Sequence, residues 1–208
     1  TEIYTLSLHD ALPICADLDV IPDRIEAGTY LIAGAAMGEI TLNYCNPNHL
    51  DVLIEKLIQA GAIIDTSENS ISIKKANPIN PVDVTTEVYP GFPTDLQAQW
   101  IALMAIASGS SVVTDTVYHD RFTHIPELNR LGANIELRDN IAKINGVDHL
   151  IGAPVMSTDI RASAALILGA IMARGQTDIS RVYHIDRGYE LIEKKFQALG
   201  VDIVRKND

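Results

Sequence analysis

Apolar residues recur in three similar blocks along the chain, each with a helical period followed by strand-like alternation. The blocks are Leu53–Asp65, Ile125–Leu137 and Leu191–Val204. In each block the helical period stops at a glycine, namely Gly61, Gly132 or Gly200. A glycine at this point is typical of a helix C-cap, and the alternation after it predicts a strand that follows at once.

A second helical pattern, rich in small residues, precedes each block and starts at Asp23, Thr94 or Thr158. Each of these helices ends in glycine and is followed by a β-prone run. The recurrence predicts an α/β domain with pseudo-threefold symmetry. Its unit contains a strand, a helix, a strand, a helix and a strand pair (a βαβαββ-type unit), over roughly residues 20–84, 85–150 and 151–208. Chance similarity of helix C-caps is the alternative, and the recurrence of both halves in the same order disfavours it.

Residues 1–15 fit neither period, and the stretch SLHDALPI resembles translated sequencing adapter. We therefore expect this segment to be non-native and the natural chain to continue upstream.

Composition indicates a soluble globular protein, with 47% apolar and 21% charged residues. The longest uncharged apolar run, Ala162–Ala173, is too short to span a bilayer and predicts a buried helix. The first residues lack the basic start of a secretory signal. Cys15 and Cys45 form neither a disulfide framework nor a metal-ligand cluster, so a reducing cytoplasm is the expected location.

The net charge of −11 argues against non-specific binding of nucleic acid, which needs a basic surface. An anionic ligand must therefore be held by a few well-placed cations. Neither GxGxxG, GxxxxGK[ST] nor GxSxG occurs in a useful form, so Rossmann, P-loop and hydrolase sites are not supported. His119 and His184 lack a metal-ligand partner at helical spacing, which argues against zinc. We interpret them, together with His124, as local hydrogen-bonding residues.

Asp95 lies in the first turn of a predicted helix in FPTDLQAQ. Pro93 and Thr94 signal the helix start, and Thr94 with Gln97 has the spacing of a capping box. An acid is favoured at this position by the helix dipole alone. A structural role and a functional role for Asp95 both stay open at this point.

Arg161 lies in the first turn of another predicted helix, with Thr158 as the expected cap and Asp159 behind it. A cation there is disfavoured by roughly 0.3–1 kcal/mol, which suggests an anionic partner. The partner is either a bound phosphate or carboxylate, or an acid of the protein such as Asp159.

Arg121 and Arg187 occupy matching places in VYHDRF and VYHIDRGYE, each directly after an aspartate. Buried Asp–Arg pairs would explain this pattern. Alternatively, pseudo-threefold symmetry brings equivalent loops together, and Arg121, Arg161 and Arg187 converge on one anion.

Five motifs in order, IPDRIEAGTY, GFPTDLQAQ, DRFTHIPEL, TDIRASAAL and YHIDRGYE, resemble the UDP-N-acetylglucosamine 1-carboxyvinyltransferases of the enolpyruvyl transferase family. The resemblance covers about residues 17–208. It implies a protein of two lobes, each an inside-out α/β barrel of three units. Residues 16–208 would be the C-terminal lobe, with the N-terminal lobe missing. The shikimate-type enolpyruvyl transferase shares the fold but not these motifs.

The resemblance implies transfer of enolpyruvyl from phosphoenolpyruvate to the 3′-hydroxyl of UDP-N-acetylglucosamine, the first committed step of peptidoglycan synthesis. Asp95 matches an acid that contacts the sugar hydroxyl and takes part in proton transfer, and Val117 matches a backbone contact to the sugar nucleotide. The residues that match phosphoenolpyruvate-associated arginines and an acid beside them are Arg121, Arg161, Arg187 and Asp159. The resemblance implies no metal or organic cofactor, no nucleic acid and no membrane.

The family's reactive cysteine and its phosphoenolpyruvate-binding lysine belong to the N-terminal lobe, and nothing here matches them. Cys45 is not in the family's cysteine motif. We therefore expect this chain alone to be inactive, because half a site cannot orient two substrates. The alternatives are a shikimate-type transferase and a binding module without catalysis.

Overall fold

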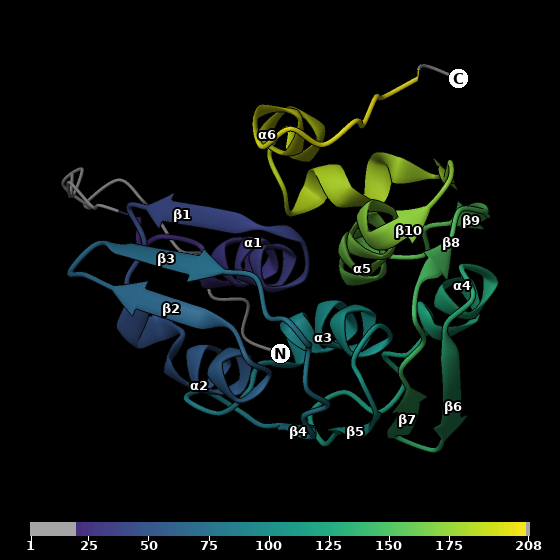
Figure 1. The fold of residues 1–208 in the computed structure, drawn as a ribbon, viewed down its shortest axis with the longest axis horizontal. Helices are drawn as coiled ribbons and strands as arrows, with labels where there is room; N and C mark the ends of the chain where they lie inside the picture. The colour runs from purple at the N-terminus through teal and green to yellow at the C-terminus, as the bar shows by residue number, and fades with distance from the viewer. Residues whose placement is uncertain (1–19, 207–208) are drawn as a thin grey trace, which may run out of the picture.

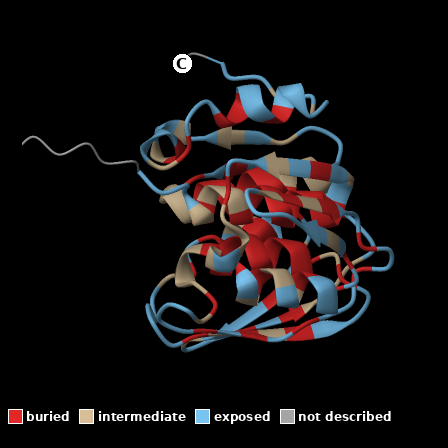
Figure 2. Ribbon diagram, turned by 90° about the vertical axis from the view of Figure 1, so that its left-hand side faces the viewer, coloured by how far each residue is buried: buried red, intermediate tan, exposed pale blue. Residues whose placement is uncertain are grey.

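Three helices that pack against one another form the centre of the molecule: α1 (Arg24–Met37), α3 (Gln97–Met104) and α5 (Ile160–Met172). The computed structural model describes residues 20–206, and Figure 1 shows these helices in the middle with the strands around them. A helix that is apolar on all sides is stable only when it is enclosed. Accordingly Leu31, Trp100 and Leu166 are fully buried. Figure 2 shows the buried residues concentrated in the middle of the molecule. The buried helix predicted at residues 162–173 is confirmed.

A three-stranded antiparallel sheet follows α1. Its strands are β1 (Glu39–Asn43), β2 (Ile63–Thr66) and β3 (Ser70–Lys74), in the order β1-β3-β2, and the short helix η2 (Pro47–His49) and α2 (Asp51–Gln59) lie between β1 and β2. Ile40 pairs with Ile73 across this sheet, and both are buried. A Cβ added at Gly34 would lie only 2.5 Å from the Ile73 side chain, so α1 packs closely on the sheet at this glycine.

A four-stranded sheet follows in the order β4-β5-β7-β6. Its strands are β4 (Val84–Thr86), β5 (Ser110–Asp115), β6 (Asn134–Arg138) and β7 (Ile141–Asn145), and the helices between them are η3 (Thr94–Leu96), α3 and α4 (Ile125–Arg130). The pair β4 and β5 is parallel, whereas β7 is antiparallel to both of its neighbours. The carboxyl ends of β4 and β5 therefore lie at one edge, where the chain turns toward η3 and residue 121.

The last part of the described chain contains two small parallel strand pairs and two helices. The strands are β8 (Leu150–Ile151) with β10 (Ala173–Arg174), and β9 (Pro154–Met156) with β11 (Asp178–Ser180). The helices are η4 (Val182–Arg187) and α6 (Ile192–Ala198). Within residues 20–206 no helix is long and apolar enough to cross a bilayer.

The strand predicted after Gly200 is wrong, because residues 201–206 form no strand. A strand needs a neighbour that completes its backbone hydrogen bonds. None of the strands in the described part of the chain pairs with this segment. Residues 1–15, which the sequence pattern set apart, lie outside the described residues.

Gly61, Gly132 and Gly200 end their helices in the same way, as predicted. Each has a positive φ, between 87° and 99°. In each case the glycine amide donates to the carbonyl three residues back, and the next amide donates to the carbonyl five residues back. This double bond is the Schellman motif, and it turns the chain directly out of α2, α4 and α6.

Replacing Gly132 by alanine is expected to lower the free energy of unfolding by about 1–2 kcal/mol, because an L side chain at positive φ crowds its own backbone. Lack of space is not the reason, since the nearest atom to an added Cβ lies at 3.8 Å. Gly38 is the matched control, because it has open space and an extended φ of 179°. Urea denaturation of Gly38→Ala should differ little from that of the parent chain. Equal losses in the two variants would contradict this account.

Candidate active site

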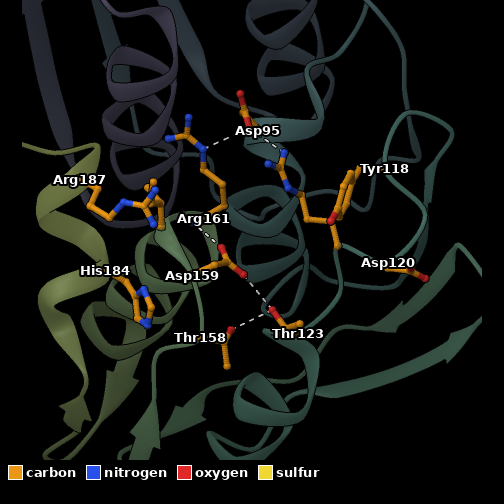
Figure 3. Close-up of a pocket in the computed structure, with 11 residues that line it drawn as sticks. Asp95, Tyr118, Asp120, Thr123, Thr158, Asp159, Arg161, His184 and Arg187 are labelled. Atoms are coloured by element: carbon orange, nitrogen blue, oxygen red, sulfur yellow. Dashed lines mark hydrogen bonds and ion pairs between the residues drawn. The ribbon is translucent and has the colours of Figure 1, made fainter.

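A cavity of about 380 Å³ lies where α5, η4 and the loops after β5 and β9 meet (Figure 3). Its charged lining consists of three aspartates, three arginines and a histidine: Asp95, Asp120, Asp159, Arg121, Arg161, Arg187 and His184. All but one of the predicted site residues are therefore brought together here. The exception is Val117, which is not in the lining and whose backbone amide donates to the Asp115 carboxylate at 3.0 Å.

Asp95 holds two arginines with a single oxygen. Its Oδ1 accepts from Arg121 Nη1 at 2.6 Å and from Arg161 Nε at 3.2 Å. Burial would raise the pKa of this carboxyl, but the charges of Arg161 and Arg121 and their hydrogen bonds outweigh burial and hold the pKa below its usual range. None of the hydrogen bonds among the described residues reaches Oδ2 of Asp95. That oxygen is available to a ligand.

The expected capping roles are wrong at both helix starts. The Thr94 hydroxyl does not cap α3 but donates to Asp115 Oδ2 at 2.6 Å. At α5 the cap is Asp159, which accepts from the amides of Arg161 at 2.8 Å and Ala162 at 2.9 Å, so Thr158 is not the cap. The capping of the two helices differs, although their sequences are similar, because the 3₁₀ turn η3 precedes α3 and no such turn precedes α5. Asp95 is thus free of capping and faces the cavity.

Arg161 has an acid of the protein as its partner, and that acid is Asp95 rather than Asp159. This interaction offsets the unfavourable effect of the helix dipole on a cation in the first turn of α5.

The expected ion pairs of Arg121 and Arg187 with the aspartates directly before them, Asp120 and Asp186, are also wrong. Arg121 pairs with Asp95, and Asp186, which precedes Arg187, is held by Arg205 at 2.6 and 3.0 Å. Arg187 reaches the cavity and makes no ion pair within residues 20–206.

Asp115 is a structural residue of the site that the sequence reasoning missed. It is fully buried at the end of β5, and its carboxylate accepts from the hydroxyls of Thr86 and Thr94 and from the amides of Val117 and Tyr118. These four bonds fix the loop that carries Arg121 and the turn that carries Asp95. An acid on the buried face of an alternating strand was the available signal, because such a position calls for an apolar residue.

Asp95, Arg121 and Arg161 form a group that we call the Asp95 cluster, and neither Cys45 nor any described histidine forms a hydrogen bond with it. The interpretation of His124 and His184 as hydrogen-bonding residues is wrong for their Nε2 atoms. Each Nε2 is buried and has no hydrogen-bond partner within the described chain. Cys45 is buried, and burial raises the pKa of its thiol. Cys15 lies outside the described residues. Within residues 20–206, no three His, Cys, Asp or Glu side chains gather in a way that suits a metal ion.

Comparison with known proteins assigns the family. Residues 12–196 match the family described as EPSP synthase (3-phosphoshikimate 1-carboxyvinyltransferase). The chain belongs to this EPSP synthase family.

The similar members of the EPSP synthase family include proteins named UDP-N-acetylglucosamine 1-carboxyvinyltransferase. The one from Chlorobium chlorochromatii is 55% identical over 88% of this chain and 44% of its own length. The one from Helicobacter pylori is 48% identical over 95% of this chain and 47% of its own length. The chain thus spans about half the length of the curated relatives it matches.

Solved structures of EPSP synthase family members confirm the mixed α/β fold. The enolpyruvyl transferase NikO from Streptomyces tendae superposes with a TM-score of 0.81 at 27% identity, over 89% of this chain and 45% of NikO. An EPSP synthase from Acinetobacter baumannii superposes with a TM-score of 0.69 over 91% of this chain and 44% of its own length. Its identity is 14%, so this second likeness bears on the fold alone.

His124 is expected to make stability fall in mildly acidic solution. Burial lowers the pKa of His124 to about 4, against the opposing effect of Asp159. Between about pH 6.5, the unfolded value, and pH 4 the unfolded chain binds a proton that the folded chain does not, so the free energy of unfolding falls by on the order of 3 kcal/mol. Urea denaturation across this range measures the effect.

His124→Leu should flatten this pH dependence, whereas the same change at the exposed His149 should leave it intact. Asp95 and Asp159, whose pKa values are lowered, affect the free energy of unfolding only at lower pH. The stabilisation that they contribute is lost as the pH falls below about 3.8. A His124→Leu profile parallel to that of the parent chain would refute the assignment to His124.

Removing Arg161 or Arg121 is expected to raise the pKa of Asp95, because each guanidinium stabilises the ionised carboxylate. Either single alanine variant should move the value toward the usual 3.8, and the double variant should move it above, since burial remains. Titration of the carboxyl carbon resonance by NMR reports the value directly. Arg138→Ala, at an exposed arginine away from the cavity, is the control and should leave the value unchanged.

Proposed function

We propose that this chain contributes to the transfer of enolpyruvyl from phosphoenolpyruvate to the 3′-hydroxyl of UDP-N-acetylglucosamine, with release of phosphate. The observation that carries the proposal is the Asp95 cluster, in which one carboxylate and two arginines meet at a cavity. The choice of substrates rests on sequence identities near 50% to proteins that are named for this reaction. The same proposal places the chain in peptidoglycan synthesis in the cytoplasm.

Asp95 acts as the base in this proposal. The reaction begins with attack of the sugar oxygen on C2 of phosphoenolpyruvate, in which the hydroxyl loses a proton and the methylene carbon gains one. Elimination of phosphate then removes a proton from that carbon. Asp95 suits the first proton transfer because its carboxyl is ionised at neutral pH and Oδ2 receives no hydrogen bond from the described residues. For this proton transfer, the position of the Asp95 carboxylate relative to the sugar hydroxyl matters more than a raised pKa of Asp95.

Arg121, Arg161 and Arg187 would bind the carboxylate and phosphate of phosphoenolpyruvate. Guanidinium groups suit both anions because they offer paired donors in one plane. Arg187 is free of ion pairs within the described chain, whereas Arg121 and Arg161 already contact Asp95. The roles given to Val117, as a backbone contact to the sugar nucleotide, and to Asp159, as a neighbouring acid, rest on the resemblance.

The chain would form the C-terminal lobe of the enzyme, an inside-out α/β barrel of three units. Mutual packing of α1, α3 and α5, with strands outside them, supports this arrangement. The three Schellman turns support a common unit. The partner would be the N-terminal lobe of the same enzyme, because the cavity offers three arginines for two anionic substrates and must already balance three aspartates.

The shikimate-type reaction is the second candidate, and the description of the matching family favours it. Sequence identity favours the UDP-sugar instead: the solved EPSP synthase is 14% identical, against 55% for the Chlorobium chlorochromatii relative. A binding module without catalysis is the third candidate.

A chimera tests these alternatives. Residues 20–206 replace the matching part of the Chlorobium chlorochromatii relative, and phosphate release is measured with phosphoenolpyruvate and either UDP-N-acetylglucosamine or shikimate-3-phosphate. We expect release with the UDP-sugar only. Asp95→Asn should reduce turnover by about 10²–10⁴-fold, the usual contribution of a general base.

Asp148→Asn, at an exposed aspartate outside the cavity, is the matched control and should retain full turnover. The 208-residue chain alone should release no phosphate. Full turnover by Asp95→Asn would contradict the role of Asp95, and release with shikimate-3-phosphate would favour the second candidate. A folded chimera that is inactive with both acceptors would favour the binding module.

A further inference from the structure

Near Arg161 lies a buried polar cluster that joins two of the central helices, α1 and α3, to the segment after η4. It consists of Thr29 on α1, Gln99 on α3 and Tyr189, which follows η4. Thr29 and Gln99 are fully buried and Tyr189 is 2% exposed. The Tyr189 hydroxyl lies 2.8 Å from Thr29 Oγ1, and Gln99 Nε2 lies 3.2 Å from each of these two oxygens. We call these three residues the tyrosine cluster.

The supply of hydrogens fixes the direction of each bond in the tyrosine cluster. The Thr29 hydroxyl donates its only hydrogen to the carbonyl of Ile25, at 2.9 Å. Tyr189 must therefore donate to Thr29, and Gln99 Nε2 donates to both oxygens. One lone pair of the Tyr189 oxygen then remains for a further donor.

Arg161 lies near the segment that carries this oxygen, because α5 packs against η4. Its Nη1 is 3.7 Å from the point that a Cβ of Gly188 would occupy, directly before Tyr189 in the chain. Burial raises the pKa of the Tyr189 phenol, and hydrogen bonds from the cluster and the charge of Arg161 oppose it. Arg161 thus bonds Asp95 and also lies close to Gly188, the residue directly before Tyr189.

Stability alone does not explain the tyrosine cluster. Gln99 Oε1 is buried and has no partner in the described chain, which makes the cluster costly. Apolar side chains of similar size would fill the space between α1, α3 and the segment after η4 without this cost. Orientation of the neighbouring arginine does explain it, because Arg161 has rotatable bonds that must be restrained before a planar anion can be bound with both ends of the guanidinium.

We propose that Tyr189 is a positioning residue for Arg161. Its oxygen, held in place by Thr29 and Gln99, accepts a hydrogen bond from the guanidinium group and fixes the plane in which that group meets Asp95 and the ligand. Tyr189 itself does not touch the ligand. The identity of the anion rests on the proposed function, whereas the position of the guanidinium does not.

The 208-residue chain, labelled with nitrogen-15, provides the test. The side-chain Nε–Hε NMR signal of Arg161 is assigned by its loss in Arg161→Lys, and its exchange with solvent is measured in Tyr189→Phe. We expect exchange to accelerate and the dissociation constant for phosphoenolpyruvate to rise, each by about threefold to tenfold, as for the loss of one hydrogen bond.

Two tyrosines elsewhere serve as matched controls for the loss of a hydroxyl. Tyr30 is as buried as Tyr189, but its hydroxyl has no partner in the described chain. Tyr183 is exposed, and its hydroxyl accepts from Arg181 at 3.1 and 3.2 Å. Tyr30→Phe and Tyr183→Phe should leave both the exchange of Arg161 and the dissociation constant unchanged.

The outcomes of this test distinguish a positioning role of Tyr189 for Arg161 from a role in packing alone. Unchanged exchange in Tyr189→Phe, or an equal change in Tyr30→Phe, would overturn the proposal. If the parent chain binds no phosphoenolpyruvate, the proposed function fails for this chain while the exchange rate still tests Tyr189. If Tyr189→Phe does not fold, Thr29→Val keeps the phenol and removes its acceptor. That variant should accelerate the exchange of Arg161 less strongly, and no change in it would also overturn the proposal.

Discussion

The geometry of the cavity depends on one carboxylate oxygen shared by two guanidinium groups. Oδ1 of Asp95 joins the turn before α3, the loop after β5 and the first turn of α5. Two arginines this close together repel each other unless an anion lies between them. Asp95 supplies that anion in the folded chain. The position of Asp95 depends in turn on Asp115, whose buried carboxylate holds Thr94 directly beside it.

Local chemistry explains why much of the fold follows from the sequence. The C-caps at Gly61, Gly132 and Gly200 need only a helix and a residue that tolerates positive φ, and both are visible in the pattern. The buried helix at α5 needs only its apolar composition. The strand expected after Gly200 failed because a strand also needs a neighbour, which no local pattern supplies.

The site was predictable in its residues but not in their contacts. Motifs identified Asp95, Arg121 and Arg161, yet the cap at α5 proved to be Asp159, and the Thr94 hydroxyl bonds Asp115. Threonine and aspartate both cap helices well, so tertiary partners decide between adjacent candidates. Sequence reasoning did not single out Tyr189, although it stands in the YHIDRGYE motif, because its partners come from α1 and α3.

Under the proposed function, the charges in the cavity couple the binding of phosphoenolpyruvate to the basicity of the Asp95 carboxylate. Arg121 and Arg161 already contact Asp95, so an anionic ligand that binds these two arginines competes with Asp95 for guanidinium contacts. A guanidinium that turns toward the ligand stabilises the carboxylate less, and the negative charge of the ligand destabilises it further. Both effects raise the pKa of Asp95. The carboxylate therefore becomes a stronger base when phosphoenolpyruvate is in place, which is also when the sugar hydroxyl must lose its proton.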